Sequence, residues 1–102
     1  MVLTEVLTPN DIYLLPQVFT LYRGCEISEL KRNSFGQAWT TSPDIAKAFA
    51  YTHYQGQYWF DENKRTVLAA TYTKEHVLFS NQPGEYEVVV DIKKLRNIRE
   101  QA

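Results

Sequence analysis

The sequence predicts one α+β domain built mainly on antiparallel strands. Most apolar residues fall in short runs rich in valine, threonine and aromatic side chains, and glycine, proline, asparagine or serine separates the runs, as in a protein of several short strands. Only one segment, which begins at Ser42, has both the capping residues and the apolar spacing of a longer helix. With 102 residues, 44% of them hydrophobic, the chain can form a single domain over residues 1–102 with its own core, but not a second domain.

Charge and cysteine content narrow the possible partners and the compartment. The formal net charge of -1 provides no basic field for nucleic acid and no polybasic patch for an anionic membrane. Cys25 is the only cysteine, so no internal disulfide can form, and no Cys or His spacing suggests a metal site. We therefore expect a soluble, cytoplasmic protein that binds no metal, membrane or nucleic acid. Its oligomeric state is not indicated by the sequence.

The first half of the chain predicts two strands and a short helix. Residues 18–23 form an apolar strand that stops at Gly24, which places Arg23 at a strand end. Residues 28–32 suggest a short helix, and the turn around Gly36 leads into a second strand over residues 37–41.

The main helix is predicted from residue 43 to about residue 54. Ser42 can cap its first turn, Pro43 suits the first helical position, and Asp44 complements the helix dipole. The apolar spacing predicts that the helix buries the face formed by Ile45, Ala48, Phe49 and Thr52.

The second half predicts a long loop followed by four strands. Residues 54–64 are aromatic but lack a period, and they are expected to form a loop. Strands are expected over residues 66–73, 76–79, 85–92 and 95–98, with a turn over residues 80–84. In the strand over residues 85–92, alternation puts Tyr86, Val88, Val90 and Ile92 on a core face and Glu85 and Glu87 together on the other face.

Three polar positions stand out in this apolar chain. They are Arg23 with Gly24, the hydroxyl run over residues 40–42, and the pair Glu85 and Glu87. Each has a simple structural explanation, because strand-end arginines and outward glutamates are usually solvated and Ser42 is explained as a cap. An arginine beside a glycine also suits a phosphate with a planar group next to it, and a nearby cation would keep two neighbouring carboxylates ionised.

In this order, the segments YRG (22–24), WTTS (39–42) and EYE (85–87) give the chain a resemblance to a known enzyme family. The chain resembles the Arg-Ser-Glu class of mono-ADP-ribosyltransferases and the small phage and bacterial proteins related to them. The resemblance implies a compact fold of two small antiparallel sheets around an NAD cleft, with one main helix. It also implies that NAD is the co-substrate, that a target protein accepts the ADP-ribose, and that the protein is a toxin or effector in a bacterium or a phage-infected cell.

The resemblance assigns catalytic roles to three residues. Glu87 corresponds to the catalytic glutamate, and Glu85 would orient an incoming guanidinium if the acceptor is arginine. Thr40 corresponds to the first hydroxyl of the family's serine-threonine-serine motif, which supports the catalytic glutamate; here the hydroxyl belongs to a threonine.

The remaining family positions imply contacts with the cofactor. Arg23 would hold an NAD phosphate, and the backbone of Gly24 would meet the nicotinamide carboxamide. Phe49 or Tyr51 would stack on nicotinamide, although the helical spacing of Phe49 equally suits a core residue. The implied cofactor-binding positions are Arg23, Gly24, Tyr22, Thr41, Phe49 and Tyr51.

The chemistry of NAD agrees with these residue types. Nicotinamide leaves as a neutral molecule, so the charge that develops is an oxocarbenium ion on the ribose, and a preplaced carboxylate stabilises it. An ordinary glycosidase needs an acid and a base on opposite sides of the bond, whereas Glu85 and Glu87 are expected on one face. The leading hypothesis is therefore a mono-ADP-ribosyltransferase. An NAD glycohydrolase and a noncatalytic protein-binding module remain alternatives.

Overall fold

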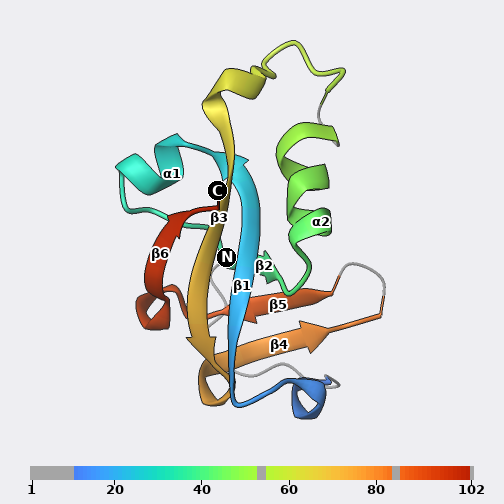
Figure 1. Ribbon diagram of the computed structural model, residues 1–102, viewed down its shortest axis with the longest axis vertical. Coiled ribbons are helices and arrows are strands. Elements are labelled where there is room, and N and C mark those ends of the chain that lie inside the picture. Colours follow the sequence, from blue (N-terminus) through green and yellow to red (C-terminus); the bar gives the residue numbers. More distant parts are fainter. Residues whose placement is uncertain (1–10, 53–54, 84–85, 102) are drawn as a thin grey trace.

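The strands form one antiparallel sheet in the order β4-β5-β2-β1-β3-β6 (Figure 1). The computed structural model describes residues 11–52, 55–83 and 86–101. Within these ranges the strands are β1 (Val18–Glu26), β2 (Ala38–Thr40), β3 (Arg65–Thr73), β4 (Val77–Asn81), β5 (Glu87–Val90) and β6 (Arg96–Glu100). The helical segments are α1 (Ser28–Lys31), α2 (Pro43–Lys47), the π-helical η2 (Ala48–Thr52), and the 3-10 turns η1 (Ile12–Leu14), η3 (Glu62–Lys64), η4 (Lys74–His76) and η5 (Ile92–Lys94). The predicted α+β class is confirmed.

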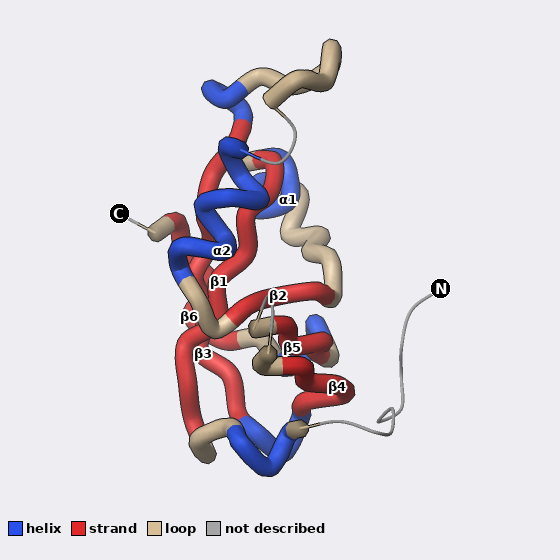
Figure 2. Tube along the Cα trace, turned by 90° about the vertical axis from the view of Figure 1, so that its right-hand side faces the viewer, coloured by secondary structure: helices blue, strands red, loops and turns tan. Residues whose placement is uncertain are grey.

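The sheet consists of two halves that meet at β1 and β2. All nine residues of β1 pair with β3, but in the described residues β1 pairs with β2 only where Tyr22 lies opposite Thr40. In Figure 1, β4 and β5 run across the direction of β1 and β3, and Figure 2 shows β2 crossing the line of β1 in the same way. Two separate sheets around a cleft are therefore not confirmed, because the Tyr22–Thr40 pair joins both halves into one sheet.

The larger apolar core lies on one face of this sheet. Its fully buried members come from β1, β3 and β5, and they are Leu21, Leu68, Ala70, Tyr72, Val88 and Val90. The alternation predicted for residues 85–92 is thus confirmed at Val88 and Val90. A curled sheet whose one face is apolar can bury that face against itself, so this core holds the two halves together.

The alternation is wrong at both ends of that predicted strand. Tyr86 is 47% exposed and has a φ of 52°, and Ile92 is 37% exposed in the turn η5. A left-handed residue does not continue a strand, so β5 begins only at Glu87. The argument that placed Glu85 and Glu87 on one face therefore does not hold, and Glu85 itself lies outside the described residues.

The helix begins as predicted but buries a different face. Ser42 caps it, since its hydroxyl accepts a hydrogen bond from the Ile45 N–H at 3.3 Å. The buried residues are Ala46 and Ala50, both 0% exposed, rather than the predicted Ile45, Ala48, Phe49 and Thr52. The change from α2 to the π-helical η2 alters the spacing, and the helix lies too close to the sheet for larger side chains. No helix in the described ranges is long and apolar enough to cross a membrane.

Gly24 explains why the helix can approach β1 so closely (Figure 2). The strand does not stop at Gly24 as predicted but continues to Glu26. A Cβ atom at Gly24 would lie 2.0 Å from the carbonyl oxygen of Ala46 and 2.5 Å from the backbone nitrogen of Ala50. Both are backbone atoms, so the glycine is required by the close contact of helix and strand.

We predict that Gly24→Ala destabilises the protein by at least about 2 kcal/mol, because the helix backbone must move to admit the methyl group. Gly56→Ala is the matched control, since nothing lies within 4 Å of a Cβ there. Its free energy of unfolding should stay within ~1 kcal/mol of wild type. Urea denaturation of the three proteins measures both effects, and equal stability of the two variants would contradict the packing argument.

Candidate functional site

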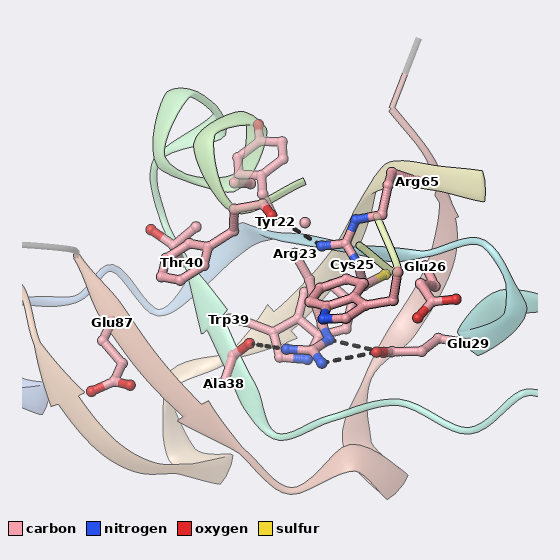
Figure 3. Close-up of a pocket in the computed structure, with 14 residues that line it drawn as sticks. Tyr22, Arg23, Cys25, Glu26, Glu29, Ala38, Trp39, Thr40, Arg65 and Glu87 are labelled. Atoms are coloured by element: carbon pink, nitrogen blue, oxygen red, sulfur yellow. Dashed lines mark hydrogen bonds and ion pairs between the residues drawn. The ribbon is translucent and has the colours of Figure 1, made fainter. Parts of the chain in front are cut away.

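A cavity of about 470 Å³ opens where β1 and β2 separate (Figure 3). Both faces of the sheet contribute to its wall because the two strands diverge there. Six of the residues that the sequence assigned to the site line it: Tyr22, Arg23, Gly24, Thr40, Phe49 and Glu87. Residues from four elements, β1, β2, η2 and β5, thus reach one cavity.

Strand register places Tyr22, Thr40 and Glu87 in one row. Thr40 on β2 pairs with Tyr22 on one side and with Glu87 on the other. Side chains directly opposite one another in antiparallel strands point to the same face, with Cβ atoms about 4.5 to 5.5 Å apart. The Thr40 side chain is buried, and its hydroxyl accepts a hydrogen bond from the Ser42 N–H at 3.1 Å. Thr40 is therefore fixed beside Glu87 by the sheet and by the start of the helix.

The backbone of Gly24 points toward the cavity edge of β1. In the β1–β3 ladder Gly24 lies opposite Val67, and just past the end of β1 the Ile27 N–H donates to the Lys64 carbonyl at 2.7 Å. Hydrogen-bonded and non-hydrogen-bonded pairs alternate in an antiparallel ladder, and Gly24 is an odd number of residues from Ile27. Its N–H and C=O therefore point away from β3, toward the side on which the cavity lies.

Arg23 is held by the chain on the opposite wall from Glu87. Its Nε and Nη2 donate to the two carboxylate oxygens of Glu29, each at 2.9 Å, and its Nη1 donates to the Ala38 carbonyl at 2.8 Å. The guanidinium also lies against Gly36, where a Cβ atom would come within 2.4 Å of Nη2. Figure 3 shows the guanidinium turned toward Glu29, while the Glu87 carboxylate lies at the other end of the cavity.

The ion pair between Arg23 and Glu29 decides the protonation of Glu29. Burial by itself would raise the pKa of this carboxyl group, but the hydrogen bonds and the charge of Arg23, together with the Gly36 N–H, outweigh burial and lower the pKa. Side-chain exposures of 21% for Arg23 and 19% for Glu29 leave little solvent to screen the pair. Glu29 is therefore ionised whenever the protein is folded near neutral pH.

Cys25 lines the same cavity but is not a reactive thiol. Burial, reinforced by the Glu29 carboxylate, raises the pKa of Cys25 to about 12, although Arg23 and Arg65 act in the opposite direction. Only a thiolate is an effective nucleophile, so this side chain functions as a small apolar group in the wall.

Two predicted site residues, Thr41 and Tyr51, do not line the cavity. The Thr41 hydroxyl donates to the Gln82 side chain at 2.9 Å, and the Tyr51 hydroxyl reaches the Arg65 carbonyl at 3.4 Å, so both are directed elsewhere. Glu85 lies outside the described residues. The proposed stacking partner on the helix is thus Phe49 rather than Tyr51, because only Phe49 lines the cavity.

Gln82 is a supporting residue that the sequence did not reveal. Its side-chain nitrogen donates to the Ser80 hydroxyl at 3.0 Å and approaches the Glu87 carbonyl at 3.5 Å, and its side-chain oxygen accepts from Thr41. The Thr41 N–H also donates to the carbonyl of the left-handed residue Tyr86 at 3.2 Å. These contacts hold the start of β5, and so the backbone of Glu87, against the end of β2.

Sequence reasoning also missed Glu29, Trp59 and Arg65, all of which line the cavity. Nothing in the sequence indicates that Glu29, in the short helix α1, pairs with Arg23 on β1. The aromatic content of the loop over residues 55–60 was the only signal for Trp59. Arg65 is anchored at the start of β3, where its Nε and Nη2 donate to the Ala50 and Phe49 carbonyls at 2.9 and 3.0 Å.

The cavity wall contains carboxylates, guanidinium groups and aromatic rings, which suits a charged organic ligand better than a metal ion. In the ranges that the structure describes, no three His, Cys, Asp or Glu side chains are grouped as metal ligands would be. Comparisons with protein-family models, with curated proteins and with solved structures found no match to the chain.

We predict that Glu29→Gln destabilises the protein by about 1 to 3 kcal/mol at pH 7, since a charged hydrogen-bonded pair is lost. Folding lowers the pKa of Glu29 below its unfolded value of 4.5. The ionised carboxylate therefore stabilises the folded protein at a pH above 4.5, and this stabilisation is lost as the pH falls through the lower pKa of the folded state. The difference between wild type and variant should therefore shrink when the pH falls below about 4.5. Denaturation measured at pH 7 and at about pH 3 tests this.

The exposed Glu62 provides the control for that experiment. Glu62→Gln should change the free energy of unfolding by less than ~0.5 kcal/mol at both pH values. A Glu29→Gln penalty that stays constant with pH would show that packing, rather than the ion pair with Arg23, is what Glu29 contributes.

Proposed function

We propose that this protein is an NAD-dependent mono-ADP-ribosyltransferase that transfers ADP-ribose to a side chain of a target protein, with arginine as the favoured acceptor. The observation that supports the proposal most strongly is the convergence on one cavity of Arg23 and Gly24 from β1, Thr40 from β2 and Glu87 from β5. The resemblance of these segments to the enzyme family was drawn from sequence order, whereas their meeting in space depends on strand pairing. The two arguments are therefore independent.

Glu87 is the proposed catalytic residue. When the bond between nicotinamide and ribose breaks, its electron pair leaves with nicotinamide, and the ribose carbon and ring oxygen share a positive charge. A carboxylate already in place next to that carbon stabilises the charge without reorganising at the moment of reaction. Glu87 is half-buried at the start of β5, so its backbone position is set by the strand, and the residue lines the cavity.

Thr40, Gly24 and Phe49 have supporting roles in this proposal. Thr40 lies beside Glu87 in the sheet and restricts where its side chain can turn. The outward N–H and C=O of Gly24 are suited to the nicotinamide carboxamide, which has both a donor and an acceptor. Phe49 supplies an aromatic face for the cationic pyridinium ring of NAD, a pairing that aromatic rings favour.

Arg23 contributes a cation whose direction is fixed before the ligand arrives. The bidentate contact with Glu29 and the contact with the Ala38 carbonyl determine the plane of the guanidinium. A phosphate of NAD would approach the same group, so in this proposal the phosphate and Glu29 share Arg23. A fixed guanidinium loses less conformational entropy on binding than a mobile side chain does.

The decisive experiment is incubation of the protein with labelled NAD, with and without a cell lysate. Mass analysis then measures free nicotinamide and ADP-ribosylated protein. A transferase releases nicotinamide and labels protein, whereas a glycohydrolase releases nicotinamide and free ADP-ribose only. A folded protein that leaves NAD intact under both conditions would instead support the noncatalytic binding module.

We predict that Glu87→Gln lowers both nicotinamide release and protein labelling by roughly a hundredfold or more, because the charge opposite the oxocarbenium ion is lost. Glu75→Gln is the control, since Glu75 is an exposed glutamate in η4 that does not line the cavity. Circular dichroism and thermal melting of both variants check folding. Full activity of Glu87→Gln would remove the basis of the enzyme proposal.

A second prediction separates transfer from hydrolysis, and it rests on sequence alone because Glu85 lies outside the described residues. If Glu85 aligns an arginine acceptor, Glu85→Gln leaves the sugar chemistry intact, so slow nicotinamide release should persist. Protein labelling should fall far more steeply, because the guanidinium loses its carboxylate partner. The ratio of labelled protein to free nicotinamide is the measurement, and a ratio equal to that of wild type would show that Glu85 does not select the acceptor.

A further inference from the structure

The cavity has two chemically different ends. Glu87 lies at one end, whereas Arg65, Glu26 and Glu29 lie at the other (Figure 3). Glu29 is engaged by Arg23, so its charge is offset within the chain. The aromatic side chain of Trp59 belongs to the end that contains Arg65, because both also line a small neighbouring hollow.

Three different functional groups meet at this end. Trp59 is 46% exposed and lines the cavity from the loop over residues 55–60. Glu26 is an exposed carboxylate at the end of β1, and Arg65 is a guanidinium at the start of β3, directly opposite Glu26 in the strand register. Lys64 and Asp61 complete the small hollow beside them.

The orientation of Arg65 is determined by the protein. Its contacts with the Phe49 and Ala50 carbonyls fix the guanidinium at the end of η2. Those carbonyls carry partial negative charge at the end of a helix and also tie the arginine to the helix that bears Phe49. Arg65 also lines both the cavity and the small hollow, as Trp59 does, so the two side chains belong to the same part of the wall.

These groups match the parts of a nucleoside diphosphate. An exposed indole stacks on a base, a carboxylate accepts hydrogen bonds from ribose hydroxyls, and a planar guanidinium binds phosphate oxygens. We propose that Trp59, Glu26 and Arg65 form a subsite for the adenosine diphosphate half of the ligand, with Trp59 as the platform for adenine. The inference rests on the proposed function, because it places the other half of NAD between Phe49 and Glu87.

The experiment compares the binding of ADP, ADP-ribose and nicotinamide mononucleotide by calorimetry. Trp59→Ala should lower the affinity for ADP and for ADP-ribose by about tenfold or more, because both ligands contain the base that stacks. The affinity for nicotinamide mononucleotide, which lacks that base, should stay unchanged. Trp59→Phe should restore part of the lost affinity. Tyr58→Ala is the matched control: Tyr58 is the neighbouring aromatic residue, is 99% exposed, does not line the cavity, and should leave all three affinities unchanged.

Arg65→Gln gives a second measurement with a different physical basis. The substitution should lower the affinity for ADP and also reduce the dependence of that affinity on salt concentration, because one cation no longer faces the diphosphate. Because Arg65 also holds η2, a thermal melt must show that this variant is folded. Trp59→Ala carries the test if the Arg65 variant does not fold.

The outcomes distinguish this inference from the proposed function. If Trp59→Ala binds ADP-ribose as tightly as wild type, or if wild type binds neither ADP nor ADP-ribose, the subsite is overturned. If wild type binds ADP through Trp59 but never releases nicotinamide from NAD, the subsite is supported and the transferase proposal fails. If Trp59→Ala cleaves NAD with an unchanged KM, the subsite is overturned although the transferase proposal survives.

Discussion

The structure depends on the separation of β1 and β2 immediately after their single pair, Tyr22 opposite Thr40. The pair joins the two halves of the sheet, and the divergence that follows creates the cavity between them. Arg23 bridges the gap by donating to the Ala38 carbonyl on β2 and to Glu29 in α1. The arginine thus compensates for strand hydrogen bonds that the divergence removes, and the ion pair with Glu29 makes up for the cost of holding a cation in a partly buried position.

The helical segments α2 and η2 form another wall of the cavity and contact β1 directly. Ala46 and Ala50 lie against Gly24, where no side chain separates helix from strand. This contact fixes the distance from the strand to Phe49, and Arg65 fastens the end of the same helix from β3. The cavity-lining residues are therefore supported by regular elements, which hold side chains more precisely than loops do. Trp59, which comes from a loop, is the exception.

Charged side chains of both signs line the cavity, and they nearly cancel one another. The Arg23–Glu29 pair is neutral as a unit, and the thiol of Cys25 is held protonated by burial and by Glu29. Glu87 lies at one end of the cavity, and Arg65 lies with Glu26 at the other end. In the proposed function, the cationic ring of NAD lies near Glu87 and its diphosphate lies near Arg65.

The sequence by itself determined the α+β class, the helix start at Ser42 and the strand core at Val88 and Val90, because these depend on local period, capping and apolar content. It also identified Arg23, Thr40 and Glu87 as candidate site residues, and all three line the cavity. It could not determine the buried helix face, because the close contact with Gly24 selects alanines over larger residues, nor the left-handed Tyr86, because alternation assumes an unbroken strand. The partners of Arg23 and the positions of Glu29, Trp59 and Arg65 in the cavity wall were decided only by tertiary structure, since folding brings together residues that have no local relationship in the chain.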